Sequence, residues 1–395
     1  MEARRRGDTE TRRGRDAERG RRGDPRVSAS PCLPLSASPR PHVPSRSEAI
    51  RAWGGPVAAV FPIHYPRALV RAFGFLPVEV WGPPRMNASS AAAHLQPYVC
   101  SIVRNGLSFL QSGGLDVADV IVVPHGCDSL QGLGSLLLDL VRPRAVVLPL
   151  YLPRGRRPSD LCFLEEELRA FAARLAEASG RRPSDEEVME SVRREEIADG
   201  LLAELHRRRR ELPLTPLELY RLIRSREYLP AESFAALAGD ALARVGEPAR
   251  DGVPILLSGI VPEPMEVLDA LAAMGGVVAA DDLAACGRRL YPPGASGDPF
   301  RRLAESLQAG PPDSARGHPI EERLAHLRRL AAASGARGVV FYDVKFCEPE
   351  LFDLPLLRRG LQEAGLPSVH IEVDLNDALA QQVLTRLEAF LEMIR

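Results

Sequence analysis

The chain has 395 residues, of which 45% are hydrophobic and 26% are charged, and its formal net charge is −1. This length accommodates two or three domains, each with its own core, and the composition is that of an ordinary globular protein. The near-zero charge gives no overall field that favours nucleic acid, and no apolar run approaches the roughly 18 residues that a membrane span needs.

Residues 1–52 are predicted to form a disordered tail. The first 26 residues are rich in arginine but contain interspersed Asp and Glu, and a Pro/Ser tract without helical or strand period follows. The interspersed acids argue against a transit peptide and against an RNA-binding arm. The tail could also be an upstream extension of the true reading frame. No secretory signal is visible, so we expect a cytoplasmic protein without a membrane or nucleic-acid partner.

Residues 53–153 are predicted to form an N-terminal α/β domain. Strands are expected at 56–63, 78–80, 120–123 and 144–152, and helices at 68–74, at 91–112 and after Asp128, which is expected to cap its helix. Strands that alternate with helices indicate a parallel sheet covered on both faces.

Residues 154–248 are predicted to form a helical segment. They are rich in Arg, Glu, Leu and Ala, with apolar residues at i, i+3 and i+4, and no strand candidate interrupts them. The HRRRR run at 206–210 is expected to be a solvated helix face.

The alternation returns in residues 249–395, which are predicted to form a C-terminal α/β domain. Its strands are expected at 255–257, 277–282, 338–346 and 367–375, and its helices at 265–276, 319–334, 351–365 and 378–394. The predicted architecture is therefore two Rossmann- or flavodoxin-like parallel-sheet domains with a helical segment between them.

None of the six cysteines lies in a C-x-x-C pair, so no zinc ribbon or thioredoxin motif is present, and we expect free thiols in a reducing cytosol. Open parallel sheets bind ligands outside the carboxyl ends of their strands. Cys127 and Cys347 each follow a predicted strand and precede a helix, and Cys100 could reach the same crevice. Three thiolates could hold one soft metal centre, or each cysteine could be a small buried hydrophobe.

Five blocks of the chain resemble, in order and spacing, those of the 2-hydroxyacyl-CoA dehydratase D-component family, which includes benzoyl-CoA reductase subunits. The blocks are PYVCSIVRNGL, VIVVPHGCDSLQ, GGVVAADDL, DVKFCEPELFDLPLL and TRLEAFLEM. The resemblance covers everything beyond the tail. It implies that Cys100, Cys127 and Cys347 bind a [4Fe–4S] cluster at the domain interface, because these positions match the family's three cysteine ligands.

The resemblance also implies a paralogous second subunit and an ATP-hydrolysing iron–sulfur activator that donates a low-potential electron. The chain itself has no G-x-x-x-x-G-K-[ST] phosphate loop, so ATP chemistry is assigned to a partner. We expect an iron–sulfur subunit of a lyase that dehydrates a 2-hydroxyacyl-CoA through a ketyl radical. The alternatives are a benzoyl-CoA reductase-type subunit, a cluster-carrying partner that is not catalytic, and a metal-free ligand-binding protein.

Further residues are assigned roles with alternatives. His125 could donate to a cluster sulfur or move a proton, or it could be an ordinary turn histidine. The strand-end residues Ser258 and Gly259 could present N–H groups to a thioester or phosphate, or could form a simple turn. Asp281 and Asp282 could accept a proton or cap a loop.

Two departures from the family pattern bear on function. The family's early block reads P-x-E before an apolar helix, whereas this chain has Pro66-Arg67-Ala68. Loss of that carboxylate favours a less catalytic subunit or an altered substrate. Cys286 is not expected to be a ligand, because relatives carry a cysteine at the position of Ala284.

Overall fold

The structure of the protein is a computed structural model that describes residues 42–246 and 251–395. These residues belong to one compact unit that spans residues 41–395. Most of the predicted tail, including Cys32, lies outside the described residues.

The end of the predicted tail is a helix rather than a disordered segment. Helix α1 (Arg46–Trp53) begins with a capping box, in which the Ser45 hydroxyl accepts from the Glu48 N–H group and the Glu48 carboxylate accepts from the Ser45 N–H group. Ala49 is buried in the core. These contacts stabilise a short helix, so the folded part of the chain begins before the predicted boundary at residue 53.

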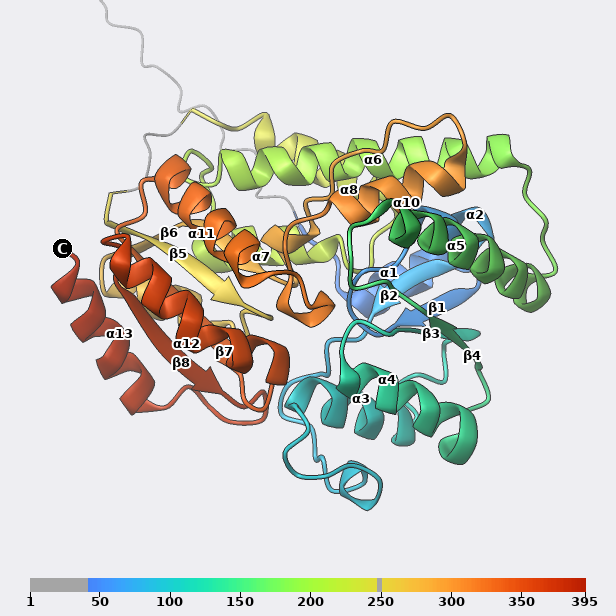
Figure 1. The fold of residues 1–395 in the computed structure, drawn as a ribbon, viewed down its shortest axis with the longest axis horizontal. Coiled ribbons are helices and arrows are strands. Elements are labelled where there is room, and N and C mark those ends of the chain that lie inside the picture. The colour runs from blue at the N-terminus through green and yellow to red at the C-terminus, as the bar shows by residue number, and fades with distance from the viewer. Residues whose placement is uncertain (1–41, 247–250) are drawn as a thin grey trace, which may run out of the picture. The chain divides into compact units, whose positions relative to one another are not determined.

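The first sheet has four parallel strands in the order β2-β1-β3-β4 (Figure 1). Its strands are β1 (Val57–Val60), β2 (Leu76–Glu79), β3 (Val120–Pro124) and β4 (Val146–Leu150). The helices that follow them are α2 (Arg67–Ala72), α3 (Ser101–Gln111), α4 (Asp128–Leu136) and α5 (Pro158–Ser179). The strand order reverses between β1 and β3, and the loops after two such strands are where sheets of this kind bind ligands.

The second sheet repeats this arrangement in the order β6-β5-β7-β8. Its strands are β5 (Val253–Gly259), β6 (Gly276–Leu283), β7 (Gly338–Val344) and β8 (Ser368–Val373). Its helices are α9 (Glu266–Ala273), α11 (Ile320–Ser334), α12 (Glu348–Glu363) and α13 (Gln381–Met393). The two four-stranded parallel sheets confirm the predicted α/β class with two Rossmann- or flavodoxin-like sheets. Both lie within one compact unit, so the domain boundaries at residues 153 and 248 remain predictions.

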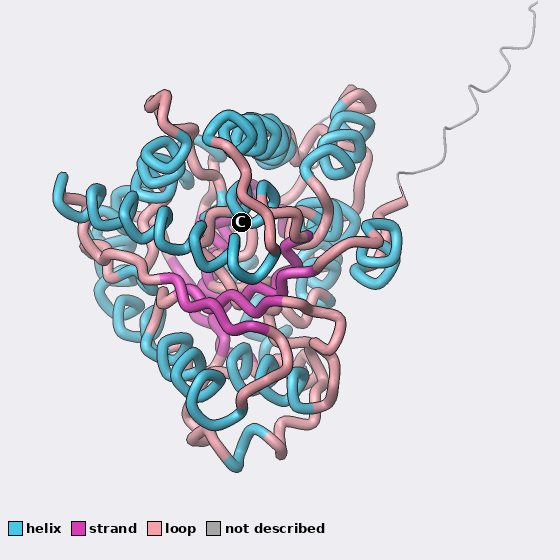
Figure 2. The backbone as a smooth tube through the Cα atoms, turned by 90° about the vertical axis from the view of Figure 1, so that its right-hand side faces the viewer, coloured by secondary structure: helices cyan, strands magenta, loops and turns pink. Residues whose placement is uncertain are grey.

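Successive side chains of the central strands face opposite layers of helices. Leu256, Val339 and Phe341 form a buried cluster with apolar side chains of α11 and α12. Ile255 and Val340 point to the other face and join a cluster that continues into the first sheet. Figure 2 shows the strands enclosed by helices on both sides. This double coverage explains why the strands appear in the sequence as unbroken apolar runs.

Three further helices follow α5 without an intervening strand, in the segment predicted to be helical. They are α6 (Asp185–Arg207), α7 (Pro216–Ser225) and α8 (Ala231–Leu242). The predicted solvated face at 206–210 is wrong for Arg209, which is 3% exposed and donates to Asp281 over 2.6 Å. A buried carboxylate needs a cation beside it, and this need overrides the tendency of an arginine run to face solvent.

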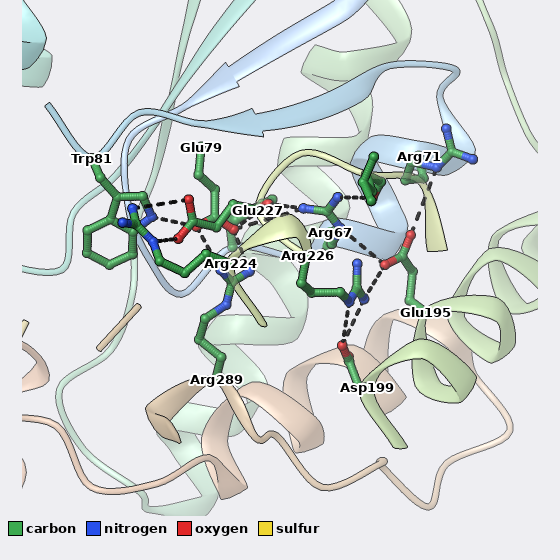
Figure 3. A network of polar contacts seen from close by, with 12 residues as sticks. Arg67, Arg71, Glu79, Trp81, Glu195, Asp199, Arg224, Arg226, Glu227 and Arg289 are labelled. Atoms are coloured by element: carbon green, nitrogen blue, oxygen red, sulfur yellow. Dashed lines mark hydrogen bonds and ion pairs between the residues drawn. The ribbon is translucent and has the colours of Figure 1, made fainter. Parts of the chain in front are cut away.

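A network of ion pairs joins the helical segment to both sheets (Figure 3). Glu195 of α6 lies 3.3 Å from Arg67 of α2 and 2.5 Å from Arg226, which follows α7. Glu79, at the end of β2, accepts from Arg289 beyond β6 over 3.0 Å. These side chains are largely buried, so the loss of one partner would leave an uncompensated charge in the interior. The network therefore ties together segments that lie far apart in the sequence.

Besides α1, the predicted elements omit helix α10 (Pro299–Ala309). Asp298 precedes it and accepts from the N–H groups of Phe300 and Arg301 over 3.0 and 2.9 Å. An aspartate followed by proline is a standard helix start, so the signal for α10 was present in the sequence. Single-turn helices occur at Ala91–Ala93, Leu137–Val141, Gly287–Arg289 and Ser314–Arg316. Within the described ranges, none of the helices combines the length and apolar character needed to cross a membrane.

Candidate functional site

Three cysteines occupy the same structural position at the start of three helices. Cys100 immediately precedes α3, Cys127 precedes α4, and Cys347 precedes α12. Two predictions are corrected here. Cys100 does not lie inside a helix that spans 91–112, because only a single turn forms before α3 begins at residue 101. Asp128 is the first residue of α4, and Cys127 takes the capping position in its place.

The three thiols influence one another electrostatically. Burial raises the pKa of the Cys100 thiol. Burial, followed by the negative charge of a neighbouring Cys100 thiolate, raises the pKa of Cys127 to about 12. The pKa of Cys347 is raised well above its usual value, first by burial and then by Cys100, with smaller effects of Glu350 and Cys127. The Cys100 thiol thus affects both of the others, and Val99, Asp128 and Glu348, each next to one of the cysteines in the sequence, line a single groove. A shared role of the three cysteines as ligands stays a prediction.

The three cysteines lie where thiolates bound to a soft cation would be stabilised. Each thiol sits at a helix N-terminus, where the helix dipole favours an anion. Without a metal, raised pKa values keep the buried Cys100 and the half-buried Cys127 and Cys347 in the protonated form, and a soft cation would replace those protons.

Among the residues that the structure describes, no three His, Cys, Asp or Glu side chains are grouped closely enough to hold a single metal ion. In an iron–sulfur cluster each thiolate binds a different iron, so the ligands lie further apart than the ligands of one ion.

Contacts between the two sheets fix the position of Cys100. The loop after β8 reaches the first turns of α3, where the N–H group of Leu375 donates to the Ser101 hydroxyl over 3.3 Å. Arg104 of α3 lies 2.9 Å from Asp374 in the same loop. The carboxyl edge of the second sheet thus meets the start of the helix that carries Cys100.

A buried ionic cluster fixes the position of Cys347. Glu350, three residues further along α12, is 2% exposed and accepts two hydrogen bonds from Arg288. Arg323 of α11 donates to Asp282 over 3.1 Å and to Glu350 over 3.4 Å. We refer to Asp282, Arg288, Arg323 and Glu350 as the carboxylate–arginine cluster. Sequence reasoning selected Asp282 but missed both arginines, since their partners are distant in the chain.

The predicted role of His125 gains no support from its surroundings. Its ring packs edge-on against Tyr151, with centroids 4.6 Å apart. A Cβ atom on Gly134 of α4 would lie 3.0 Å from the His125 Nε2 atom, so the ring is also covered by that helix. Burial lowers the pKa of His125, against the opposing effect of the Glu167 carboxylate. The role of His125 in moving protons therefore stays a prediction.

Ser258 and Gly259 lie inside the second sheet. Ser258 is fully buried, and its hydroxyl donates to Asp282 over 3.0 Å. A Cβ atom on Gly259 would come within 2.0 Å of the Tyr342 carbonyl oxygen, so only glycine fits there. Neither residue reaches an open surface, and contact with a substrate remains a prediction for both. Asp282 is held ionised by Arg288 and Arg323, which lower its pKa, so it acts as a structural anion.

A polar cavity of about 80 Å³ lies at the carboxyl end of β1. Its wall includes His64, Arg67, Ala68, Glu79, Arg226 and Tyr291. Figure 3 shows several of its charged side chains converging from α2, β2 and the segment after α7. Ala68, which stands where the family's early block has a glutamate, is 3% exposed. Sequence reasoning missed His64 and Tyr291, for which no motif provided a signal.

Thiol reactivity should follow burial in iron-free protein. We expect an alkylating reagent to modify the exposed Cys162 at least about tenfold faster than Cys100, Cys127 or Cys347, because the thiolate is the nucleophile and burial raises their pKa values. Mass spectrometry of the cysteine-containing peptides at short labelling times measures these rates. Urea-unfolded protein, in which the rates should become equal, is the control. Fast labelling of Cys100 in the folded chain would contradict the buried site.

The chain is similar to proteins of known activity over most of its length. The family described as "2-hydroxyglutaryl-CoA dehydratase, D-component" matches residues 62–394. The (R)-phenyllactyl-CoA dehydratase beta subunit of Clostridium sporogenes is 25% identical over 341 residues, which cover 84% of this chain and 90% of that protein. The beta subunit of lactoyl-CoA dehydratase from Anaerotignum propionicum is 25% identical, with 86% and 92% covered. A benzoyl-CoA reductase subunit of Thauera aromatica is 24% identical, with 86% and 91% covered.

Proposed function

The chain belongs to the 2-hydroxyglutaryl-CoA dehydratase D-component family, and from this premise we propose that it is the iron–sulfur subunit of an enzyme that dehydrates a 2-hydroxyacyl-CoA. The observation that carries the proposal is that each of the three cysteines starts a different helix and that their sequence neighbours Val99, Asp128 and Glu348 line one groove. The net reaction removes the α-hydroxyl and a β-proton as water and leaves a 2-enoyl thioester, without net oxidation or reduction.

Cys100, Cys127 and Cys347 would hold a [4Fe–4S] cluster through one iron each, with the fourth iron open to solvent or substrate. When bound, the cluster would supply a single electron at low potential. The protein holds the thiolates in place through the loop after β8 at α3 and the carboxylate–arginine cluster at α12. The three helix N-termini supply partial positive charge that stabilises the anionic sulfur ligands.

A groove of about 460 Å³ lies beside the thiols and is a route for a CoA thioester. It is lined by residues next to the cysteines, namely Asp128 and Glu348, and by apolar side chains that include Leu95, Leu136 and Leu140. A mixed apolar and polar wall suits an acyl chain that carries a hydroxyl group.

A second subunit would cover apolar side chains that surround the site. Tyr98, Leu140 and Phe352 are 61%, 71% and 77% exposed, and they belong to the three segments that carry the thiols. Large exposed apolar side chains of this kind mark interaction surfaces. The names of the relatives, which are beta subunits, support a paralogous partner. An ATP-hydrolysing activator would deliver the electron, since the chain has no phosphate-loop motif.

A second candidate function is a cluster-carrying subunit that supports a catalytic paralogue. Ala68 favours this function, because it places a methyl group rather than a carboxylate on the wall of the polar cavity. Similarity to a benzoyl-CoA reductase subunit keeps reduction of an aromatic thioester as the alternative reaction.

The test is anaerobic reconstitution of the full chain with a paralogous second subunit and an ATP-dependent activator. We expect 2-hydroxyacyl-CoA to be converted to 2-enoyl-CoA and benzoyl-CoA to remain unchanged, as measured by chromatography of the thioesters. Omission of the paralogue should abolish turnover. Turnover by this chain with the activator alone would exclude the supporting role, and reduction of benzoyl-CoA would replace dehydration by the alternative.

A further inference from the structure

Two buried polar side chains, His64 and Asp313, and the partly buried Tyr291 lie in contact with one another in series, apart from the thiols. The Tyr291 hydroxyl lies 2.9 Å from His64 Nδ1. On the other side of the ring, His64 Nε2 lies 3.4 Å from Asp313 Oδ2, at ion-pair distance, and neither atom has a hydrogen-bond partner among the described residues. His64 is 4% exposed and Asp313 is fully buried. The order carboxylate, imidazole, hydroxyl is that of an acid–base triad.

The three residues come from separate segments, and the fold strains its backbone to bring them together. His64 follows β1 and has a φ of 62°, a left-handed conformation that residues other than glycine rarely adopt. A Cβ atom on Gly126 would lie 3.8 Å from His64 Cδ2. The imidazole therefore lies beside the loop that carries Cys127, a position that sequence reasoning had assigned to His125.

Neighbouring charges define which atom carries the proton. Arg288, whose Nη1 atom is 3.5 Å from Asp313 Oδ2, holds the pKa of that carboxyl well below its usual range. Burial lowers the pKa of His64. The Asp313 carboxylate opposes this by raising the pKa, and the charges of Arg316 and Arg288 lower it further. The ring is therefore neutral, and an ionised carboxylate can only accept. The proton lies on Nε2, and Nδ1 accepts from the Tyr291 hydroxyl.

The hydroxyl end of this triad faces the polar cavity. Tyr291 and His64 both line its wall, and a volume of about 80 Å³ holds two or three water molecules. Arg226 lines the same cavity, and its buried Nη1 atom has no hydrogen-bond partner among the described residues. The wall of the cavity thus includes an arginine with an unpartnered donor atom, as expected of a site that holds water or an anionic oxygen.

We propose that Asp313, His64 and Tyr291 form a proton relay that takes up one proton from this cavity, holds it on His64 and returns it to the cavity. In one direction the Tyr291 hydroxyl gives its proton to His64 Nδ1, and the resulting phenolate takes a proton from the cavity. The imidazolium then lies beside the ionised Asp313. The reverse sequence delivers one proton to the cavity, and no electron is transferred in either direction. The relay rests on the proposed function, since a dehydration must remove one proton and protonate a leaving hydroxyl.

The first arm of the test examines the full chain alone by NMR with ¹⁵N-labelled histidine. Signals of His64 are those that disappear in His64→Gln. We expect the Nε2–H tautomer, a change in the Nδ1 resonance in Tyr291→Phe, and a change in the Nε2 resonance in Asp313→Asn. A His64 ring that carries its proton on Nδ1, or that does not respond to Tyr291→Phe, would overturn the relay. This arm needs neither cluster nor partner.

The second arm measures turnover in the reconstituted complex. We expect Tyr291→Phe to lower kcat about 100-fold, with an unchanged iron content and KM and an altered pH profile, because acid–base catalysis contributes at about that level. The matched control is Tyr228→Phe, which removes a buried hydroxyl that donates to the Pro44 carbonyl over 2.8 Å. Normal turnover in Tyr291→Phe would reject the relay. An inactive wild-type complex would instead reject the proposed function, and the NMR arm would then decide the relay by itself.

Discussion

Replacement of any one of Cys100, Cys127 and Cys347 by alanine should reduce iron and acid-labile sulfide from about four of each per chain to nearly none. The reason is geometric: each thiol ends a different loop and starts a different helix, so no neighbouring cysteine can replace a lost ligand. The measurement is chemical analysis of iron and sulfide in the full chain purified without oxygen, with visible absorption as a second readout.

Two other cysteines provide matched controls. Cys162 is exposed on α5, and Cys286 is fully buried beyond β6. Neither replacement by alanine should change the iron content, whereas circular dichroism should show that all five variants fold. A variant of Cys127 that keeps its iron would exclude the proposed ligand set. Loss of iron in Cys286→Ala would indicate that the centre lies elsewhere in the second sheet.

The second large effect should follow from Arg288→Met, which we expect to lower the free energy of unfolding by about 3–5 kcal/mol. Arg288 is fully buried and lies within 3.5 Å of Asp282, Asp313 and Glu350. Its removal leaves three buried carboxylates with too few cations, although methionine fills a similar volume. Urea unfolding followed by circular dichroism measures the change.

The pH dependence of the same variant supplies an independent check. Arg288 holds the pKa values of Asp282 and Asp313 below their usual range. A carboxyl group whose pKa is lowered by folding contributes stability that is complete above its unfolded pKa, near 4, and is lost as the pH falls toward the folded value. Wild-type stability should therefore decline below about pH 4, and in Arg288→Met this loss on acidification should be smaller, because the two carboxyl groups no longer have the cation that lowers their pKa values in the folded state.

The control for Arg288 is Arg85→Met. Arg85 forms an ion pair with Glu266 over 2.9 Å, but both side chains are mostly exposed. Pairs of this kind contribute little to stability, so we expect no measurable change in the urea midpoint. If Arg85→Met and Arg288→Met changed the urea midpoint equally little, the carboxylate–arginine cluster would not be what stabilises the start of α12.

Much of the fold could be predicted because its elements have local causes. β3 and β7 are unbroken apolar runs, and such runs indicate strands covered on both faces. The placement of Cys127 and Cys347 after these strands led to the correct edge of each sheet, since ligands bind at the carboxyl ends. Cys100 was placed inside a helix although Pro97, three residues before it, is a local signal that a helix is interrupted.

The sequence by itself therefore determined the α/β class, the two parallel sheets, the family and the three cysteines whose sequence neighbours line one groove. Only the tertiary structure decided which charged residues are buried and what they bind. Arg209 looked solvated in its arginine run, yet it pairs with Asp281, and no pattern joined Arg288 to Glu350 or His64 to Tyr291. Helices and strands each impose a local spacing on the hydrophobic residues, so these elements can be recognised in the sequence. Buried ion pairs form between segments that meet only when the two sheets come together, and no local pattern encodes that meeting.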